Sequence, residues 1–416
     1  MTRPRFPADE LDRDARVLFL TRVTRMFAYG FLAVVLVLYL AAIGLPAEAI
    51  GLLLSLTLVG DTLISLWLTT SADRLGRRRV LVVGALLMAG AGLVFAITRE
   101  PVVLLLAATI GVISPSGNEV GPFLAVEQAS LTQTVSGAGR TNVFAWYNLV
   151  GSVATAFGAL AAGGLAQVLQ ASGVGPADSY RAIVIGYAGI GLLLAAIFAR
   201  LSARVEVVHT AGPAVPGTRF GLGRSRGVVF RLSALFSLDA FAGGLITQSL
   251  VAYWFAVRWG VEPGVLGAIF FGANILAAVS ALSAARLAAR FGLINTMVFT
   301  HLPSNVLLIL VPLMPTLPLA VLVLLARFSI SQMDVPTRQS YTMAVVDPDE
   351  RSAAAGVTGI ARTTGSAVSP LLAAPLLGSA GLAAVPFFLA GGLKIVYDLI
   401  LYRLFRAAPA PEEAVR

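Results

Sequence analysis

Asp73-Arg74-Leu75-Gly76-Arg77-Arg78-Arg79 separates two long apolar runs near the start of the chain. A weaker copy of this turn, Ala289-Arg290-Phe291-Gly292, lies 216 residues later. Each copy closes an apolar run that opens at a turn rich in glycine, residues 44–51 in the first and 260–267 in the second. The repeat predicts a membrane protein of two similar halves, an internal symmetry that is typical of transporters.

The composition independently indicates a membrane protein. Apolar residues make up 57% of the chain and charged residues 12%, with a mean hydropathy of +0.86, which is far from an ordinary soluble domain. A bilayer span needs about 20 mostly apolar residues, and the chain supplies about twelve such stretches. They are predicted at 17–42, 47–71, 80–98, 101–127, 141–168, 180–203, 229–256, 263–288, 293–313, 316–340, 352–378 and 382–405.

The distribution of basic residues predicts the orientation. If the N-terminus is cytoplasmic, the arginines outside the spans fall almost entirely on the cytoplasmic side, and Arg99, Arg181 and Arg258 face the other side. Both termini are therefore predicted to be cytoplasmic, in a multi-pass protein of the cell (inner, cytoplasmic) membrane. The net charge of +9 is a topology signal. We expect no nucleic-acid partner, because no soluble domain is predicted to carry a basic face.

The spans divide the chain into two bundles. Residues 1–16 form a cytoplasmic tail with no apolar signal-peptide core, so the first span is expected to act as an uncleaved anchor. The predicted organisation continues with a six-helix bundle over 17–203, a linker over 204–228 rich in Gly, Pro and Arg, a second bundle over 229–405 and a tail over 406–416.

Several chemistries are disfavoured by what the sequence lacks. The chain has no cysteine and two histidines, His209 and His301, so we expect no metal site and no cofactor. It has no H-E-x-x-H motif and no phosphate-binding G-x-x-x-x-G-K-[ST] loop. An intramembrane enzyme is therefore the weakest interpretation, and we expect a protein that is not an enzyme and is driven by an ion gradient. His301 could titrate near neutral pH or serve as a packing residue.

The turn between the second and third spans resembles a motif of the major facilitator superfamily, G-x-x-x-D-R-x-G-R-R. Here it reads Thr69-Thr-Ser-Ala-Asp73-Arg74-Leu75-Gly76-Arg77-Arg78, with Thr69 in place of the leading Gly. The resemblance implies an all-α membrane fold of two pseudo-symmetric six-helix bundles. It also implies a conformational latch, in which Asp73 faces the N-terminus of the eleventh helix. The predicted latch residues are Asp73, Arg74, Gly76, Arg77, Arg78 and Glu127, with Glu127 as a partner for Arg74. The alternative is a plain basic turn that obeys the positive-inside rule.

Ionisable residues at membrane depth mark the candidate sites, because each costs at least about 2.5 kcal/mol unless it is paired or hydrated. Asp61, Glu119 and Asp239 are the candidates for proton coupling, with structural carboxylates as the alternative. Lys394 and Asp398 have the i,i+4 spacing of a structural pair. Arg362 has no acid on its own helix, so it needs a partner from another helix or an anionic substrate. The substrate-binding candidates are Arg25, Tyr29, Asn148, Asn274, Arg327, Asp334 and Arg362.

These patterns favour a monomeric secondary active transporter in the lipid bilayer. We expect alternating access, coupling to protons and a small polar or anionic organic solute as substrate. A helix-5 signature of exporters is poorly matched at Ala159–Gly164, so this motif does not settle the direction. Export is slightly favoured by analogy with compact bacterial members of the superfamily that lack long loops. The alternatives are a proton-coupled uptake symporter and a sensor of the same fold that binds a solute without moving it.

Overall fold

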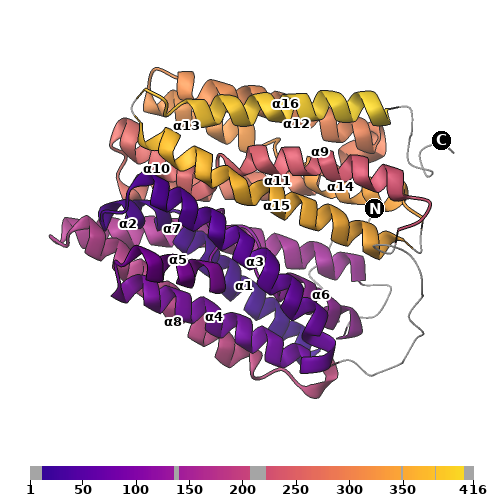
Figure 1. Cartoon of the computed structure of the whole chain (residues 1–416), viewed down its shortest axis with the longest axis horizontal. Helices are drawn as coiled ribbons and strands as arrows, with labels where there is room; N and C mark the ends of the chain where they lie inside the picture. The colour runs from indigo at the N-terminus through magenta and orange to yellow at the C-terminus, as the bar shows by residue number, and fades with distance from the viewer. Residues whose placement is uncertain (1–11, 135–139, 207–221, 348–349, 380, 407–416) are drawn as a thin grey trace. The chain divides into compact units, whose positions relative to one another are not determined.

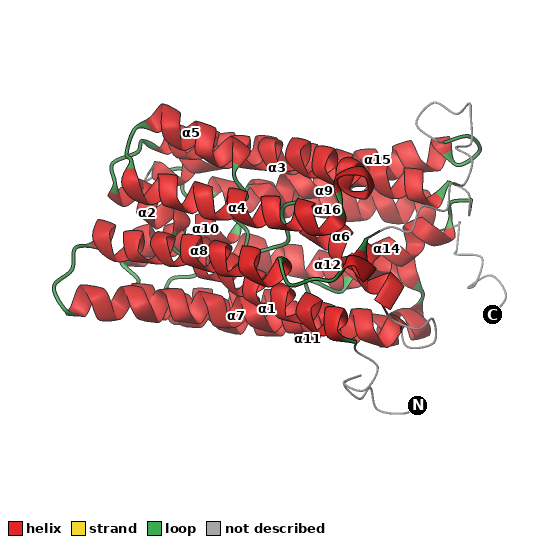
Figure 2. Cartoon of the chain, turned by 90° about the horizontal axis from the view of Figure 1, so that it is seen from below, coloured by secondary structure: helices red, strands yellow, loops and turns green. Residues whose placement is uncertain are grey.

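The computed structural model describes residues 12–134, 140–206, 222–347, 350–379 and 381–406, and every regular element among them is helical (Figure 2). The helices are labelled in Figure 1. They are α1 (Arg13–Ala33), α2 (Leu36–Ala42), α3 (Ala47–Leu75), α4 (Arg77–Ile97), α5 (Pro101–Ile110), α6 (Phe123–Thr134), α7 (Arg140–Ala171), α8 (Pro176–Phe198), α9 (Arg226–Gly244), α10 (Gln248–Trp259), α11 (Pro263–Phe291), α12 (Leu293–Leu310), α13 (Leu317–Phe328), α14 (Asp334–Ala344), α15 (Arg351–Gly378) and α16 (Val385–Phe405), with two short 3-10 turns at Ala203–Val205 and Val311–Leu313.

The helices follow the spans predicted from hydropathy. Within the described residues, eight spans have the length and apolar character needed to cross a membrane, or nine when α1 and α2, which meet at a bend of 41°, count as one. The predicted fourth span is broken into α5 and α6, and the predicted tenth into α13 and α14. The fourth breaks where Pro115 and Pro122 remove backbone donors and Gly117 and Gly121 adopt positive φ.

The internal repeat is visible in the backbone. Helices α3 and α11 each have 29 residues and occupy equivalent positions in the two copies. Each ends at a glycine of the repeated turn, Gly76 with φ of 94° and Gly292 with φ of 86°. Because this region of φ is strained for any residue with a side chain, the glycine of the motif has a structural reason to be there.

The described helices group into two compact units, which we describe separately. Unit 1 is Met1–Ala211 with Val251–Phe271, and unit 2 is Gly212–Leu250 with Gly272–Arg416. In unit 1, α1 packs on α7 and α8, α4 packs on α8, and α3 packs on α5. In unit 2, α9 packs on α15, and α12 packs on α16 and α14.

Unit 1 contains a close helix crossing between α7 and the beginning of α11. A Cβ built on Gly163 would lie 2.3 Å from the carbonyl oxygen of Pro263, and one on Gly267 would lie 2.8 Å from that of Ala159. The Gln167 amide also donates to Glu262 at 3.0 Å. The small residues therefore let the two backbones touch. Helix α11 continues beyond Phe271 into unit 2 without a break.

Candidate functional site

A bidentate ion pair lies at the centre of unit 1. Arg25 on α1 donates from both terminal nitrogens to the two carboxylate oxygens of Glu127 on α6, each at 2.7 Å. Both side chains are 0% exposed. Thr21 donates to Glu127 at 2.9 Å, and the Tyr147 hydroxyl on α7 donates to it as well. A buried pair with this geometry and these extra donors satisfies the polar groups that burial strips of water.

A second carboxylate completes the unit 1 network. Glu119 lies in the break between α5 and α6 and pairs with both buried arginines of α1, with Arg22 and, at 2.9 Å, with Arg25 Nε. The Arg22 guanidinium also lies 5.0 Å from the centre of the Tyr147 ring. The charges of Arg22 and Arg25 are therefore compensated by carboxylates within the same unit.

Asp61 lies apart from this network. It is on α3 and accepts hydrogen bonds from the backbone N–H of Gly121 and from the Ser65 hydroxyl. Among the described residues it has no ion-pair partner, unlike Glu119. Its carboxylate is hydrogen-bonded to Gly121, at the end of the segment between α5 and α6 that carries Glu119. The charge state of Asp61 therefore affects how this segment is held.

Among the described residues, the carboxylate of Glu127 is bound by Arg25, Thr21 and Tyr147. Its pairing with Arg74 in the latch stays a prediction. The side chains of Asp73 and Arg74 lie outside the described residues. The rest of the turn contacts the segment after α8: the backbone N–H of Arg77 donates to Glu206 at 2.6 Å, and the Arg78 guanidinium donates to the carbonyl of Leu201 at 3.2 Å.

Glu350 in unit 2 resembles Glu206 in unit 1, because both carboxylates accept backbone N–H groups at the start of a helix. It accepts hydrogen bonds from the backbone N–H groups of Gly223, Arg224 and Ser225 at 2.9, 3.0 and 3.0 Å, just before α9 begins. Desolvation raises the pKa of Glu350, but the hydrogen bonds from Gly223, Ser225 and Arg224 outweigh it and hold the pKa below its ordinary value. The helix start therefore favours the charged carboxylate.

Unit 2 contains its own charge network, built around Asp239 on α9. Lys394 on α16 donates to Asp239 Oδ1 at 2.5 Å, and Arg338 on α14 donates to Asp239 Oδ2 at 3.1 Å. Arg338 also pairs with Asp334, one turn earlier on the same helix, at 3.1 Å. Asp239 and Asp334 are therefore both paired with basic side chains of the same unit, and Asp334 is directed toward Arg338.

The expected pair of Lys394 with Asp398 is replaced by two separate contacts. Lys394 turns to Asp239, and Asp398 is instead bound by α12, where His301 Nδ1 lies 2.8 Å from Asp398 Oδ1 and Asn305 donates to Oδ2 at 2.9 Å. The i,i+4 spacing allows a bridge along α16, but partners from neighbouring helices compete for both side chains and are better placed.

Of the arginines of unit 2 that are not exposed, two have no ion-pair partner among the described residues. Arg327 on α13 is 8% exposed, and Arg362 on α15 is partly buried. The Nε of each is buried without a hydrogen-bond acceptor. Buried guanidinium groups are expensive unless they are paired, so these two are the strongest anion-binding candidates in the structure.

The other substrate-binding candidates have separate surroundings within their own units. Tyr29 is fully buried and donates to the carbonyl of Val120 at 3.0 Å, so it supports the break between α5 and α6. Asn274 donates to Gln248 at 3.2 Å within unit 2. Asn148 is exposed on α7. Arg25 is committed to Glu127 and Glu119.

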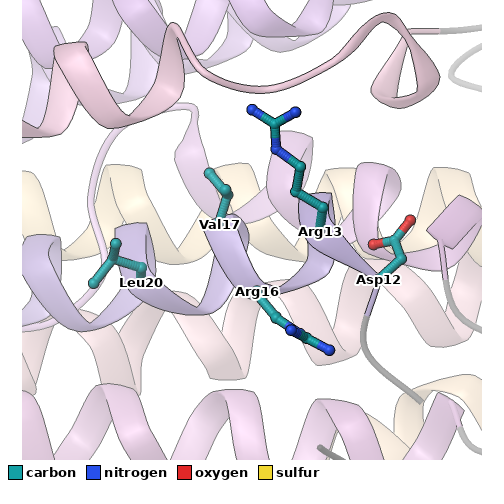
Figure 3. A pocket seen from close by; sticks show the side chains of 5 residues that line it. All are labelled: Asp12, Arg13, Arg16, Val17 and Leu20. Carbon is teal, nitrogen blue, oxygen red and sulfur yellow. The ribbon is translucent and has the colours of Figure 1, made fainter. Parts of the chain in front are cut away.

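Unit 1 also has a pocket at the start of α1. It is lined by Asp12, Arg13, Arg16, Val17 and Leu20 (Figure 3). Asp12 caps the helix by accepting from the backbone N–H of Ala15 at 2.7 Å. None of the sequence-predicted site residues lines this pocket.

Sequence reasoning missed Asn305 and the partner of His301. Asn305 lies four residues after His301 on α12, and this spacing places the two on one helix face, a signal that the sequence offers. Asp398 lies 97 residues from His301, and no local pattern connects them. Tyr147 was visible as a polar aromatic residue, but its bond to Glu127 depends on helix packing.

Comparisons with known proteins agree with this architecture. The sequence profile described as Major Facilitator Superfamily matches residues 18–370. An uncharacterized membrane protein of Saccharomyces cerevisiae is 30% identical over 427 residues, covering 96% of this chain and 95% of the yeast protein.

Solved structures of transporters share the fold at low sequence identity. The nucleoside transporter NupG superposes with a TM-score of 0.69 at 14% identity, covering 95% of this chain and 100% of NupG. A D-xylose-proton symporter gives 0.70 at 14% identity, over 93% of this chain and 97% of the symporter. A bacterial homolog of the lysosomal transporter Spinster gives 0.70 at 15% identity, over 95% and 97% of the two chains.

Proposed function

The chain belongs to the Major Facilitator Superfamily, and from this premise we propose that it is a proton-coupled secondary transporter for a small polar or anionic organic solute. Its two halves would expose a shared site alternately to the two sides of the membrane. We place it as a monomer in the cell membrane with both termini and the arginine-rich turns on the cytoplasmic side. The latch at Asp73, Arg74 and Gly76 remains part of this proposal.

The proposal of an anionic solute rests on one observation, the unpaired arginines of unit 2. Arg327 and Arg362 keep their charge without a carboxylate among the described residues, whereas Arg22, Arg25, Arg338 and Lys394 are all paired. A carboxylate or phosphate group on a solute would supply the missing partner, because the planar guanidinium binds such groups through two parallel hydrogen bonds. Arg362 and Arg327 are therefore the proposed substrate-binding pair.

Proton coupling is proposed chiefly through Asp61. Glu119 and Asp239, the other candidates, are held by fixed cations, which stabilise their charged forms. Asp61 has none among the described residues, and a lone carboxylate at membrane depth is costly to keep charged. Its protonation would weaken the hydrogen bond from Gly121 and so loosen the segment that carries Glu119. A proton symporter among the structural neighbours supports the compatibility of this fold with such coupling.

Export is the proposed direction, on the analogy of compact bacterial members of the superfamily without long loops. Uptake by proton symport is the alternative, and both use the same residues. Reconstituted vesicles with a pH gradient imposed in either direction distinguish export from uptake. Net solute movement is expected only under the gradient whose proton flow drives that direction of transport.

The proposal is tested in proteoliposomes that contain a pH-sensitive dye and are challenged with organic anions, cations and neutral drugs. We expect an organic anion to move protons. The Arg362→Ala variant should lose this response, while Arg286→Ala, which removes an equal charge from an exposed site on α11, should keep it. Asp61→Asn should abolish proton movement but allow solute exchange.

Three outcomes would contradict parts of the proposal. Unchanged solute affinity in Arg362→Ala would exclude the substrate-binding role. Unchanged proton movement in Asp61→Asn would exclude the coupling role. If solutes stabilise the protein against heat but none crosses the membrane, the chain is a sensor of the same fold.

A further inference from the structure

The ionisable side chains within the helices of unit 2 form one electrostatic network. Asp239 interacts with most of the others, including Arg327 and Arg362, which form no ion pair with it. Among the described residues, the charged members that are buried or partly buried are four cations and three carboxylates: Arg327, Arg338, Arg362, Lys394, Asp239, Asp334 and Asp398. With His301 in its neutral form, the network therefore has a net charge of +1.

Two further acids in the described part of unit 2, Asp347 and Glu350, lie outside this network. Glu350 is bonded by backbone N–H groups just before α9, and Asp347 pairs with exposed Arg224 at 3.1 Å. Glu350 immediately precedes α15, and Arg362 follows it by 12 residues on that helix, a separation of about 18 Å along the axis. These two acids are therefore compensated locally and do not enter the count.

The count decides between two ways of filling the site. Two guanidinium groups without an ion pair could each take an anionic group, which would favour a dicarboxylate or a phosphate. Asp398, however, has close partners that are neutral, His301 at 2.8 Å and Asn305 at 2.9 Å. One positive charge of the network therefore compensates Asp398 at longer range, and only one remains for a solute.

We propose that the site in unit 2 selects solutes with a single negative charge, such as a monocarboxylate, over solutes with two. A bound monoanion brings the network to zero net charge. A bound dianion leaves a charge of −1 without compensation away from water, which is unfavourable. The inference names the substrate class of the proposed function and rests on that function for the site itself.

Matched probes of equal carbon skeleton test the charge rule. The protein in lipid nanodiscs is titrated at pH 8, where an ordinary imidazole is neutral, with butanoate, butanedioate and butanamide. The rise in unfolding temperature reports binding of each probe. We expect butanoate to bind at least about tenfold more tightly than butanedioate, because unmatched charge is penalised, and the amide to bind least. Equal or tighter binding of butanedioate would overturn the proposal.

Variants that change the count should change the preference. Asp334→Asn raises the net charge to +2 and should favour butanedioate over butanoate, while Arg338 can still donate to the asparagine carbonyl. Arg327→Gln lowers the net charge to zero and should lose butanoate binding. Asp178→Asn, the same change at an exposed acid of unit 1, should keep the original order of the probes.

The reversal in Asp334→Asn is the decisive readout, because a loosened fold would weaken both probes alike. An unchanged preference in this variant, or an equal loss of both probes, would overturn the charge rule.

The charge rule and the proposed function fail separately. If butanoate is preferred but no anion crosses the membrane of proteoliposomes, the charge rule stands and the transport function falls. If dicarboxylates are bound and transported better, the transport function stands and the charge rule falls. If neither class of anion stabilises the protein, the anion site of unit 2 falls and the charge rule falls with it.

Discussion

The buried charges of the two units are arranged in opposite senses. In unit 1 the cations lie on α1 and the carboxylates on and just before α6, whereas in unit 2 the central carboxylate lies on α9 and its cation Arg338 on α14. Helices α1 and α9 open the two halves of the repeat, and α6 and α14 are each the second part of the broken span of their half. Equivalent positions therefore carry reversed charge.

The networks also differ in completeness. Each buried arginine of α1 in unit 1, Arg22 and Arg25, has a carboxylate partner, and the pair of Arg25 with Glu127 is bidentate and fully buried. In the described part of unit 2, Arg327 and Arg362 are not exposed and have no acid partner, and His301 faces two acids. The unit 1 network thus has a carboxylate for each buried arginine of α1, whereas unit 2 keeps two guanidinium groups without one among the described residues. The variants below test this distinction.

The largest expected effect is in the closed network. Glu127→Ala should destabilise the protein by about 3–5 kcal/mol, because it leaves Arg25 buried beside only a shared carboxylate. Thermal unfolding in one detergent measures the loss, with Glu48→Ala, an exposed acid on α3, as the control. The double variant Arg25→Met with Glu127→Leu should recover much of it. Equal stability of Glu127→Ala and Glu48→Ala would refute the structural role.

A smaller loss is expected at the centre of unit 2. Lys394→Met removes one of the two cations on Asp239, but Arg338 remains, so the cost should be about 1.5–3 kcal/mol. The same unfolding assay measures it. A loss as large as that of Glu127→Ala would mean that the buried charges of unit 2 are as fully paired as those of unit 1. That result would contradict the difference between the two networks.

Removal of an unpaired arginine should cost almost nothing. Arg362→Met should change the stability by less than about 1 kcal/mol, because it removes a partly buried charge that has no partner to leave behind. Organic anions should no longer raise its unfolding temperature, although they still raise that of Arg286→Met. A large loss of stability without anions would reveal a structural partner for Arg362.

The smallest effect concerns Glu350 and appears as a change with pH. Its pKa is lowered in the folded protein, so its contribution to stability is complete above the ordinary value of about 4.5 and is lost as the pH falls through the folded value. Glu350→Gln should therefore be less stable near neutral pH and lose less on acidification. Unfolding from pH 7 to pH 3.5 measures this, with exposed Glu100→Gln as the control. Parallel curves would exclude the effect.

Helix positions were predictable because they depend on local composition. Apolar runs of membrane length and the glycines of the repeated turn are readable from the chain, and Gly76 and Gly292 adopt matching backbone conformations. The break in the fourth span was signalled by its prolines and glycines. The division into two bundles and the orientation stay predictions.

Partners between helices were not predictable, because a single sequence does not say which faces meet. Arg362 was predicted to have no acid on its own helix, and it has no ion-pair partner among the described residues. Lys394 was predicted to pair with Asp398, and it pairs with Asp239 instead. Glu127 binds Arg25, a partner that its sequence position does not indicate. Which partner a side chain takes depends on how the helices pack, and residue spacing within one helix does not specify that packing.

The path of α11 has a consequence for how such a molecule could move. The helix begins in unit 1, pressed against α7 at Gly163, and ends in unit 2, with the boundary between Phe271 and Gly272. Two bodies joined by one uninterrupted helix cannot shift independently, so the helix must bend elastically or peel from one of them. Glycine at the boundary lowers the resistance to bending. Any movement of one unit against the other would then deform α11, and the bent helix would resist that movement elastically.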